Sequence, residues 1–472
     1  MPQLPTKRRF NKQKPNKQVP VNPPFHFGMI RSCRSLIASL LFFVAPADLI
    51  AAEAPYNDSL AQFCINLQPK ANQSANPDEM IKIARLFAAQ NGWKLAWHNH
   101  NQRGMTARFQ YIFYINEIKQ LRLSAFFVSD RLRGMQNEIY QGSNPTTLTV
   151  FNTACNLFEH RQIRYLDDGR MERITVQRSG KADEQIWINP PLLTKKNDKP
   201  PATVPAIIVG HIDSGIDYRR TDFQPHLIYD RDGDLVALDL WDGDRLPFDA
   251  NLARSPFYPQ SHGSYVVDVL RKIGTDFQLL PVRYPRQNMR LMQDAVEWLA
   301  THKAQIVMVP LGSRDADEWE AFFATAARHP EMLFIISAGN NGLDLGKQPI
   351  YPAVNQLSNA ITVTSTLGNG TVADGVNFGK YVGIGLPAEN LTATGVNDQE
   401  TLMSGSSFAV PKLAAYAICI AAGGKDKTMD GAELAAAITQ SIGPQHDNTG
   451  YGLFLSDSQL NAVCAPYRRA SQ

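Results

Sequence analysis

The sequence has little cysteine, no excess of glycine or proline, and no internal repeat. With five cysteines in 472 residues, the chain is not a small disulfide-held scaffold, and it is long enough to bury a core of ordinary size. Glycine (31 residues) and proline (30 residues) are near ordinary usage, which excludes a collagen-like protein, and the absence of a repeat excludes a solenoid or propeller. With 44% apolar and 19% charged residues the chain is not disordered throughout, and its length allows two or three domains.

A general excess of positive charge is also missing. Eight basic residues and one acid give residues 1–52 a net charge of +7, so the formal +3 of the whole chain leaves −4 for the remainder. A remainder with this charge has no general attraction for nucleic acid, and we expect no nucleic acid partner.

Long apolar runs are absent except near the N-terminus, where residues 36–44 form a run too short to span a bilayer. Two arginines precede this run and small alanines follow it, which is the layout of a secretory signal peptide over residues 29–54. An uncleaved N-terminal anchor is the alternative. Met29 is a candidate start, which would make residues 1–28 a basic extension upstream of it. We expect a secreted or periplasmic protein, with no stable membrane insertion after leader cleavage and no later membrane span.

Four cysteines lie beyond the leader, an even number in a chain expected to be exported. Four cysteines allow three pairings, and their spacings match no zinc pattern. We predict a bond between Cys64 and Cys155, because only these two lie in the N-terminal region of the exported chain. The second predicted bond, between Cys419 and Cys464, would join the C-terminal tail to a predicted helix.

Two differently patterned regions follow the leader. Residues 55–190 predict a small α+β domain, with a helix capped at Asn76 and a hairpin that turns at Asp168-Gly169. Prolines and lysines indicate a linker over 191–203. From 204 to 472, short apolar runs alternate with helical segments, which is typical of a parallel sheet with helices on both faces. Strand-like runs in the first region are 107–115, 120–128, 147–152 and the hairpin 162–176; in the second, the apolar runs are 206–212, 277–283, 305–311, 332–338 and 360–365, and the helical segments are 291–302, 315–329 and 408–422.

Three residues with useful chemistry stand at the ends or starts of these predicted elements. Asp213 ends the strand 206–212, at the sheet edge where ligands of open α/β sheets bind. Asn340 follows the strand 332–338, and His262 begins an apolar helical segment. Each of them alone is equally typical of an ordinary turn or helix cap.

Residues 405–411, Gly-Ser-Ser-Phe-Ala-Val-Pro, form the most specific motif. A helical pattern continues after Pro411, and proline is tolerated only in the first turn of a helix, so the helix must begin near Ser407. The Ser407 hydroxyl and backbone N–H then lie at the positive end of the helix, where a developing oxyanion is stabilised. The motif differs from the G-x-S-x-G of α/β-hydrolases.

In their order Asp, His, Asn, Ser and in their spacing, these elements resemble the subtilisin-like serine peptidases, or subtilases, over about residues 204–440. Pro310-Leu311-Gly312 is similar to the family's Ser-Leu-Gly substrate strand, and residues 240–244 and 385–390 are similar to two further family stretches. The resemblance implies an α/β fold: a subtilisin-like doubly wound parallel sheet with helices on both faces, preceded by the small α+β N-terminal domain.

The resemblance also implies a role for each matching residue. Ser407 would be the nucleophile, His262 the general base and Asp213 its orienting carboxylate, while Asn340 and the Ser407 N–H would form the oxyanion hole. The strand 310–312 would bind substrate. The expected function is that of an exported serine endopeptidase acting on polypeptides, with no required cofactor. The alternative is a non-catalytic protein-binding module on the same fold.

Several features leave the substrate and the regulation open. Asp268, Pro310 and Lys412 stand where the family usually has Gly, Ser and His. The acidic stretch 230–234 has part of a calcium-loop pattern without its final Glu, so an acidic surface loop is expected and no metal is assigned. Position and linker favour a pro-domain or regulatory role for residues 55–190. Its size, its predicted disulfide and the short lead-in before 206 make a retained domain that covers or extends the cleft the alternative.

Overall fold

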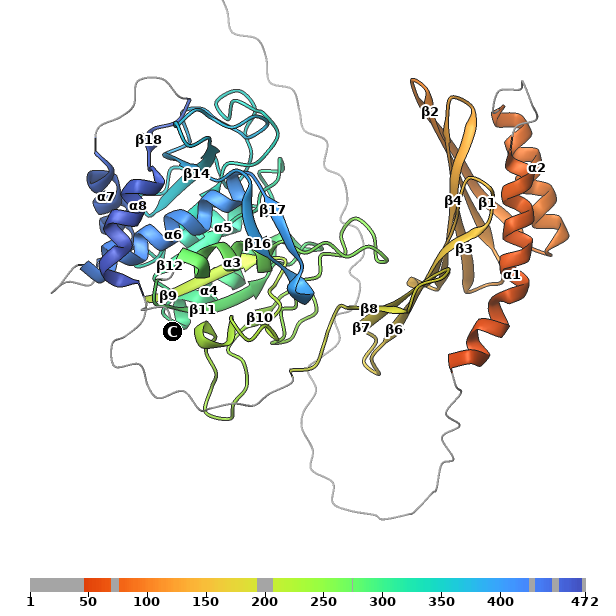
Figure 1. Ribbon diagram of the computed structural model, residues 1–472, viewed down its shortest axis with the longest axis horizontal. Helices are drawn as coiled ribbons and strands as arrows, with labels where there is room; N and C mark the ends of the chain where they lie inside the picture. The colour runs from red at the N-terminus through yellow and green to blue at the C-terminus, as the bar shows by residue number, and fades with distance from the viewer. Residues whose placement is uncertain are drawn as a thin grey trace, which may run out of the picture. The chain divides into compact units, whose positions relative to one another are not determined.

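An antiparallel sheet and a parallel sheet, each of eight strands, are the two main sheets of the structure, a computed structural model that describes residues 46–68, 76–192, 207–273, 275–423, 429–443 and 450–468 (Figure 1). The chain divides into a segment of residues 1–55 and a compact unit of residues 56–472. The predicted extension at 1–28, most of the predicted leader and the predicted linker residues 193–203 lie outside the described residues.

The N-terminal sheet is an eight-stranded antiparallel meander in which each strand pairs with the next along the chain. Helices α1 (Pro46–Leu67) and α2 (Pro77–Gln90) cover one face of it (Figure 1). As predicted, Asn76 caps α2: its side chain accepts a hydrogen bond from the Asp78 N–H. The strands are β1 (Lys94–Arg103), β2 (Thr106–Tyr114), β3 (Lys119–Val128), β4 (Arg131–Gln141), β5 (Asn144–Phe151), β6 (Leu157–Tyr165), β7 (Met171–Arg178) and β8 (Glu184–Trp187).

Alternation of buried and exposed residues explains how this sheet holds its helices. Every second residue of β2 is buried, namely Phe109, Tyr111 and Phe113, and these rings form one core with apolar residues of α1 and α2. The predicted disulfide between Cys64 of α1 and Cys155 of the β5–β6 turn is confirmed, with an S–S distance of 2.05 Å. It fixes the first helix to the sheet across 91 residues of chain.

The second sheet is parallel throughout, in the order β10-β11-β9-β12-β13-β14-β15-β18. Its strands have few polar residues because both faces are covered. The predicted doubly wound parallel sheet is therefore confirmed. The strands are β9 (Ile207–Asp213), β10 (Leu238–Asp239), β11 (Phe277–Arg283), β12 (Ile306–Val309), β13 (Leu333–Ser337), β14 (Ala360–Thr366), β15 (Ile384–Pro387) and β18 (Leu453–Phe454).

Two separate hydrophobic cores lie on the two faces of the parallel sheet. Val209 of β9 belongs to the core under α3, α6 and α7, whereas Ile212 of the same strand belongs to the core under α4 and α5. A hairpin of β16 and β17 contacts α3. These elements are α3 (Gly263–Ile273), α4 (Met292–Thr301), α5 (Glu320–Ala326), α6 (Ser406–Gly423), α7 (Gly431–Ile442), α8 (Asp457–Cys464), β16 (Leu391–Thr394) and β17 (Glu400–Met403), with short 3-10 helices at Gln224–His226, Met289–Leu291, Val396–Asp398 and Ala465–Tyr467.

Strand β9 marks the point where the winding of the sheet reverses, because β11 lies on one side of it and β12 on the other. Ligands of open α/β sheets bind outside the carboxyl ends of the strands at such a point. Asp213 is the last residue of β9, and Pro310 and Asn340 follow β12 and β13. The topology thus brings three residues predicted for the site to one edge.

One expectation from the sequence needs correction. No segment after the leader was expected to be long and apolar enough to span a membrane, but helix α6 has that length and composition. It lies in the interior of the parallel-sheet domain, and 78% of its most apolar window is buried. The predicted disulfide between Cys419 of α6 and Cys464 of α8 is confirmed. The Lys412 ammonium of α6 also binds Asp457 of α8 and the Pro387 carbonyl, which gives this departure from the family pattern a structural role.

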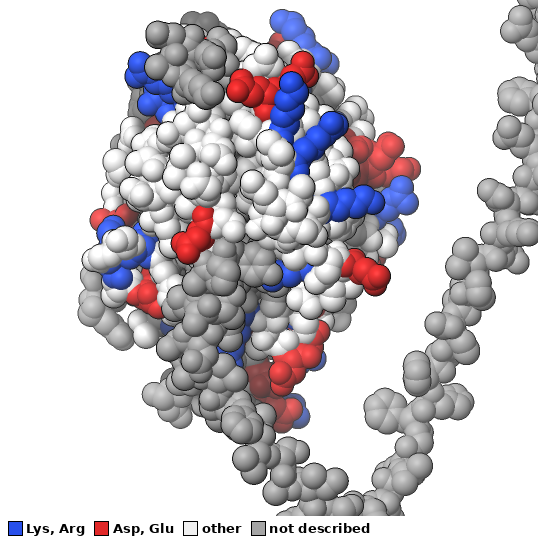
Figure 2. All heavy atoms as spheres, turned by 90° about the vertical axis from the view of Figure 1, so that its right-hand side faces the viewer, with Lys and Arg blue, Asp and Glu red and all other residues white. Residues whose placement is uncertain are grey.

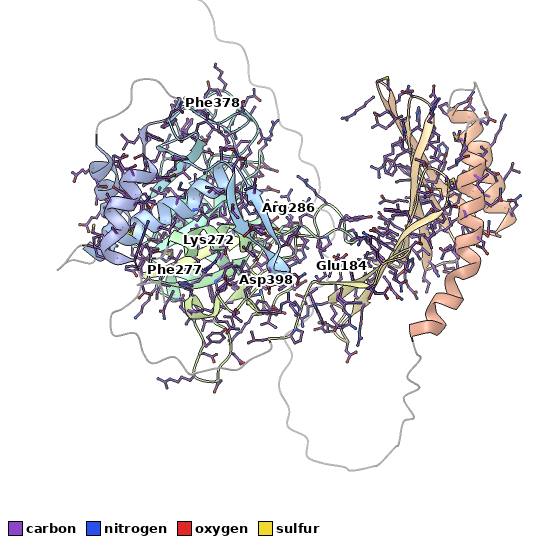
Figure 3. All side chains as sticks on the ribbon, viewed as in Figure 1. Glu184, Lys272, Phe277, Arg286, Phe378 and Asp398 are labelled. Carbon is purple, nitrogen blue, oxygen red and sulfur yellow. A yellow bond between two sulfur atoms is a disulfide. The ribbon has the colours of Figure 1, made fainter. Side chains whose placement is uncertain are left out.

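Asp268, which like Lys412 departs from the family pattern, is a fully buried carboxylate on α3. Its oxygens accept from the guanidinium groups of Arg220 (2.7 Å) and Arg271 (2.8 Å) and from the Thr394 N–H of β16 (2.8 Å). Lys272, labelled in Figure 3, lies 2.9 Å from Asp268 and donates to the Thr392 carbonyl. A charge in place of a glycine therefore joins α3 to the β16–β17 hairpin.

On the face of the molecule seen in Figure 2, charges of both signs are interspersed, and most of the described surface is uncharged and drawn white. Among the described residues of this face, no broad field of one sign is visible.

Candidate active site

Asp213 and His262 form a close pair at the carboxyl edge of the parallel sheet. His262 Nδ1 lies 2.9 Å from Oδ1 and 2.8 Å from Oδ2 of Asp213. Because an ionised carboxylate can only accept, Nδ1 carries a proton and Nε2 of the neutral ring is the free acceptor. The Asp213 side chain is 4% exposed and that of His262 is 32% exposed, so the pair is anchored in the protein while the ring still reaches solvent.

The two partners shift each other's pKa in opposite directions. Burial raises the pKa of Asp213, but the charge and hydrogen bond of His262 outweigh this and leave it below its usual value. Burial lowers the pKa of His262, but Asp213 outweighs this too, and the His262 pKa lies above its usual value. The imidazolium form is therefore stabilised at this position.

Asp249 is a buried residue of the site that the sequence did not reveal. Its carboxylate accepts from the backbone N–H groups of His262 (3.0 Å) and Ser264 (2.8 Å) and from the Ser214 hydroxyl (2.6 Å). Ser214 Oγ in turn accepts from the Gly263 N–H (3.1 Å). The first N–H groups of α3 thus all have acceptors, which fixes the backbone that carries His262. A lone Asp in a loop gives no signal that could have identified it.

His211 is a second buried residue beside the pair, two positions before Asp213 on β9. Its Nε2 lies 3.3 Å from the Gly263 carbonyl and 3.7 Å from Asp213 Oδ2. Burial lowers the pKa of His211, so the ring is neutral and its Nε2–H donates to the carbonyl that follows His262. Gly263 has to be glycine, because a Cβ there would lie 2.1 Å from the Gly215 carbonyl oxygen.

Ser407 lies in the first turn of α6, which confirms the predicted start of this helix. Its hydroxyl is nearly buried and donates to the Pro310 carbonyl (3.3 Å) rather than to His262. The rings of His262 and Phe408 have centroids 5.7 Å apart, so the starts of α3 and α6 are neighbours. N–H groups of a first helical turn have no partner within the helix, and that of Ser407 is one of them.

Asn340 is joined directly to the start of α6. Its Oδ1 accepts from the backbone N–H (3.0 Å) and the hydroxyl (2.9 Å) of Ser406. A backbone N–H can only donate, which identifies the amide oxygen and leaves the Nδ2 hydrogens for another acceptor. Gly405, with φ +117°, permits this approach, since a Cβ there would lie 2.9 Å from Asn340 Oδ1. The structure therefore places Asn340 in contact with Ser406, the residue next to the predicted nucleophile Ser407.

The predicted substrate strand follows β12. Pro310 is buried, Leu311 is half-buried and Gly312 is exposed. The next residue, Ser313, exchanges two backbone hydrogen bonds of 2.8 Å with Tyr351, which holds the strand in an extended conformation. A Cβ on Gly312 would lie 2.7 Å from the Tyr351 carbonyl oxygen, so this glycine permits a close approach of two backbones.

The acidic stretch 230–234 forms a turn in which Asp230 Oδ1 accepts from the N–H groups of Asp232 and Asp234, both at 3.0 Å. Within the part of the chain that the structure describes, no group of three or more His, Cys, Asp or Glu is arranged to hold a metal ion.

Comparisons with known proteins agree on one family. The model of the subtilase family matches residues 205–453. The chain is 23% identical over 269 residues to a thermophilic serine proteinase of Bacillus sp. strain AK1, covering 54% of this chain and 60% of that protein. It is 22% identical over 173 residues to a thermostable alkaline protease of Halalkalibacterium halodurans, covering 34% and 46%. The chain thus matches less than two thirds of either relative's length.

Two solved structures of proteases align with about half of this chain. A cold adapted subtilisin-like serine proteinase aligns with a TM-score of 0.44 and 17% identity, covering 53% of this chain and 88% of that one. The prenylagaramide maturation protease PagA aligns with a TM-score of 0.39 and 19% identity, covering 52% and 85%.

Proposed function

Because the chain belongs to the subtilase family, we propose that it is an exported serine endopeptidase that hydrolyses peptide bonds through Ser407, His262 and Asp213. The observation that carries the proposal is the pairing of His262 Nδ1 with both oxygens of Asp213 beside the start of α6. This pairing leaves the base nitrogen available on the side of the ring away from the carboxylate. Both confirmed disulfides support export, because such bonds persist in oxidising compartments.

In this mechanism the Ser407 side chain rotates, so that its hydroxyl donates a hydrogen bond to His262 Nε2 instead of to the Pro310 carbonyl. Hydrogen bonds of catalytic groups often form fully only when substrate is bound. His262 removes the proton as Ser407 Oγ attacks the substrate carbonyl carbon, and Asp213 stabilises the imidazolium. The imidazolium then protonates the leaving amine. In the second half of the reaction, His262 takes a proton from a water molecule that attacks the acyl-enzyme, and Ser407 is released with its proton restored. The oxyanion would be bound by Asn340 Nδ2 and the Ser407 N–H.

The strand 310–312 would align the main chain of the peptide next to the nucleophile. With no N–H at Pro310, this strand has one donor fewer than a strand of ordinary residues. The alternative, a non-catalytic binding module, would have no need to keep all four of these residue types, and Asp213, His262, Asn340 and Ser407 are all present.

A fluorophosphonate probe tests the proposal directly, since it reacts only with an activated serine. We expect one label per folded chain, located on Ser407 by peptide mapping. The heat-denatured protein is the control and should take no label, because the activated serine needs its base. A folded protein that takes no label, or a label on another serine, would contradict the proposed function.

We expect kcat/KM for a peptide substrate to rise with pH through the pKa of His262, because only the neutral ring accepts the Ser407 proton. The net shift of this pKa is upward, so the midpoint should lie above the ordinary histidine value of about 6.5. The rate of fluorophosphonate labelling should follow the same profile, since it depends on the same base. A midpoint at or below the ordinary value would contradict the pairing of His262 with Asp213.

A further inference from the structure

A hairpin stands between Asp249 and the proposed catalytic base. Asn251 and Gln260 close it with two backbone hydrogen bonds of 2.8 and 3.0 Å. Immediately after it, the Ser261 hydroxyl donates to the Asp249 carbonyl and the His262 N–H donates to the Asp249 carboxylate. A displacement of the hairpin would therefore be passed on to His262 within two residues.

The tip of this hairpin is buried against the N-terminal sheet. Phe257 is fully buried and belongs to one hydrophobic core with Leu148 of β5, Ile163 of β6 and Val176 of β7. The guanidinium of Arg161 on β6 donates to the Phe257 carbonyl (2.8 Å) and stacks on the Tyr258 ring at 4.0 Å. The contact therefore combines apolar burial with a directed hydrogen bond and a cation–π interaction.

The hairpin also contacts a buried charge pair of the sheet, Glu159 and Arg161. Glu159 and Arg161 both have side chains 7% exposed and lie 2.7 Å apart. Tyr258 donates its hydroxyl to Glu159 (3.1 Å), and Arg178 of β7 binds the other Glu159 oxygen (2.6 Å). Arg178 also binds Glu184 of β8, labelled in Figure 3. Separation of the hairpin from the sheet would uncover these charges on the sheet and Phe257 on the hairpin, which is unfavourable.

A neighbouring loop, residues 240–244, extends the contact. Asn189, just after β8, donates to the Asp242 carboxylate (3.1 Å), and Arg170 of the β6–β7 turn binds Asp244. Tyr218 donates its hydroxyl to the carbonyl of Pro190. Besides the hairpin tip, the parallel-sheet domain thus contacts Arg170 in the β6–β7 turn of the sheet and Asn189 and Pro190 just after the sheet.

We propose that the β5–β8 end of the N-terminal sheet is a permanent docking surface for the hairpin 251–260, and that this docking holds His262 in its working position. The N-terminal domain then stays bound after a cut in the linker, which selects the retained domain over a pro-domain that is shed. The docking itself stands on the contacts alone, whereas its effect on His262 rests on the proposed function.

The first test measures docking without using activity. A recognition sequence for a specific protease is placed within residues 193–206 of the full-length chain carrying Ser407→Ala, and the folded protein is cut there. We expect the two pieces to elute together in size-exclusion chromatography. Tyr258→Ala and Arg161→Ala should separate them. Arg164→Ala is the matched control on the same strand, because its side chain is 64% exposed, and it should not. Separation of the folded pieces without any hairpin change would overturn the docking.

The second test measures the effect on the site in uncut protein. Tyr258→Ala changes a side chain that is 37% exposed, so it disturbs the contact without opening the core. We expect kcat to fall about 10- to 100-fold with little change in KM, measured well below the unfolding temperature, while Arg164→Ala keeps the original rate. An unchanged kcat in a variant whose pieces separate would overturn the positioning role. If the unsubstituted chain neither hydrolyses peptides nor takes the probe, the proposed function fails while the elution test still decides the docking.

Discussion

Ser407→Ala should abolish peptide hydrolysis and leave the fold intact. Only one oxygen is removed, and its single hydrogen bond, to the Pro310 carbonyl, is long at 3.3 Å. The helix start does not depend on it, since Ser406 and not Ser407 makes the contacts with Asn340. The expected loss in kcat is about a million-fold, which is the scale measured for subtilisin and not a value derived from this structure. Steady-state kinetics on a peptide, with circular dichroism as the check on folding, measures it.

Ser404→Ala is the matched control for this change. Ser404 lies just before α6, is exposed, and accepts a hydrogen bond from the Asn390 N–H. Its loss should change activity little. Full activity in Ser407→Ala would show that another group is the nucleophile, and Ser404 and Ser406 would then be the residues to test.

Asn340→Ala should lower kcat by about 10²- to 10³-fold with little change in KM, again on the scale known for subtilisin. The Asn340 amide hydrogens would meet the substrate oxygen only when it becomes negatively charged, so their loss affects the transition state more than binding. The measurement is a comparison of kcat and KM at substrate concentrations on both sides of KM.

Two further variants distinguish the role of the Asn340 amide hydrogens from the role of its Oδ1, which holds Ser406. Asn340→Asp keeps an oxygen that can accept from Ser406 but has no amide hydrogen, so it should not restore the rate. Recovery in Asn340→Asp would mean that the anchoring of Ser406 was the role of Asn340. Asn341→Ala is the neighbouring control, because Asn341 contacts Asn377 through its backbone N–H, and its activity should be unchanged.

The parallel-sheet domain was largely predictable because its strands are continuous apolar runs. Runs such as 277–283 coincide with β11, since a strand buried on both faces is mostly apolar and does not alternate with polar residues. The N-terminal sheet was only partly predictable. Strand β1 (Lys94–Arg103) is polar and largely exposed, and β4 (Arg131–Gln141) contains Gly134 and several charges, so neither has the pattern of a buried strand.

The residues of the site differ in the same way. Asp213 and Asn340 follow strands and Ser407 begins a helix, and the local sequence pattern predicted each of these positions relative to its element. Asp249 and the hairpin tip at Phe257 depend on contacts between segments far apart in sequence. Phe257 lies 96 residues from its partner Arg161, and no local pattern records such a contact. Prolines at 256 and 259 made this segment resemble an ordinary loop.

The connection between α6 and α8 has a consequence for the durability of the proposed peptidase. A cut of the chain anywhere between Gly423 and Ser456 would leave α8 attached through the sulfurs of Cys419 and Cys464. After the same cut under reducing conditions, only non-covalent contacts would hold α8 and its Asp457, the carboxylate that binds the nearly buried Lys412 ammonium five residues after Ser407. An uncompensated ammonium is costly at such a depth. The redox state of one cystine would therefore decide whether self-digestion of the tail is tolerated or inactivates the protein.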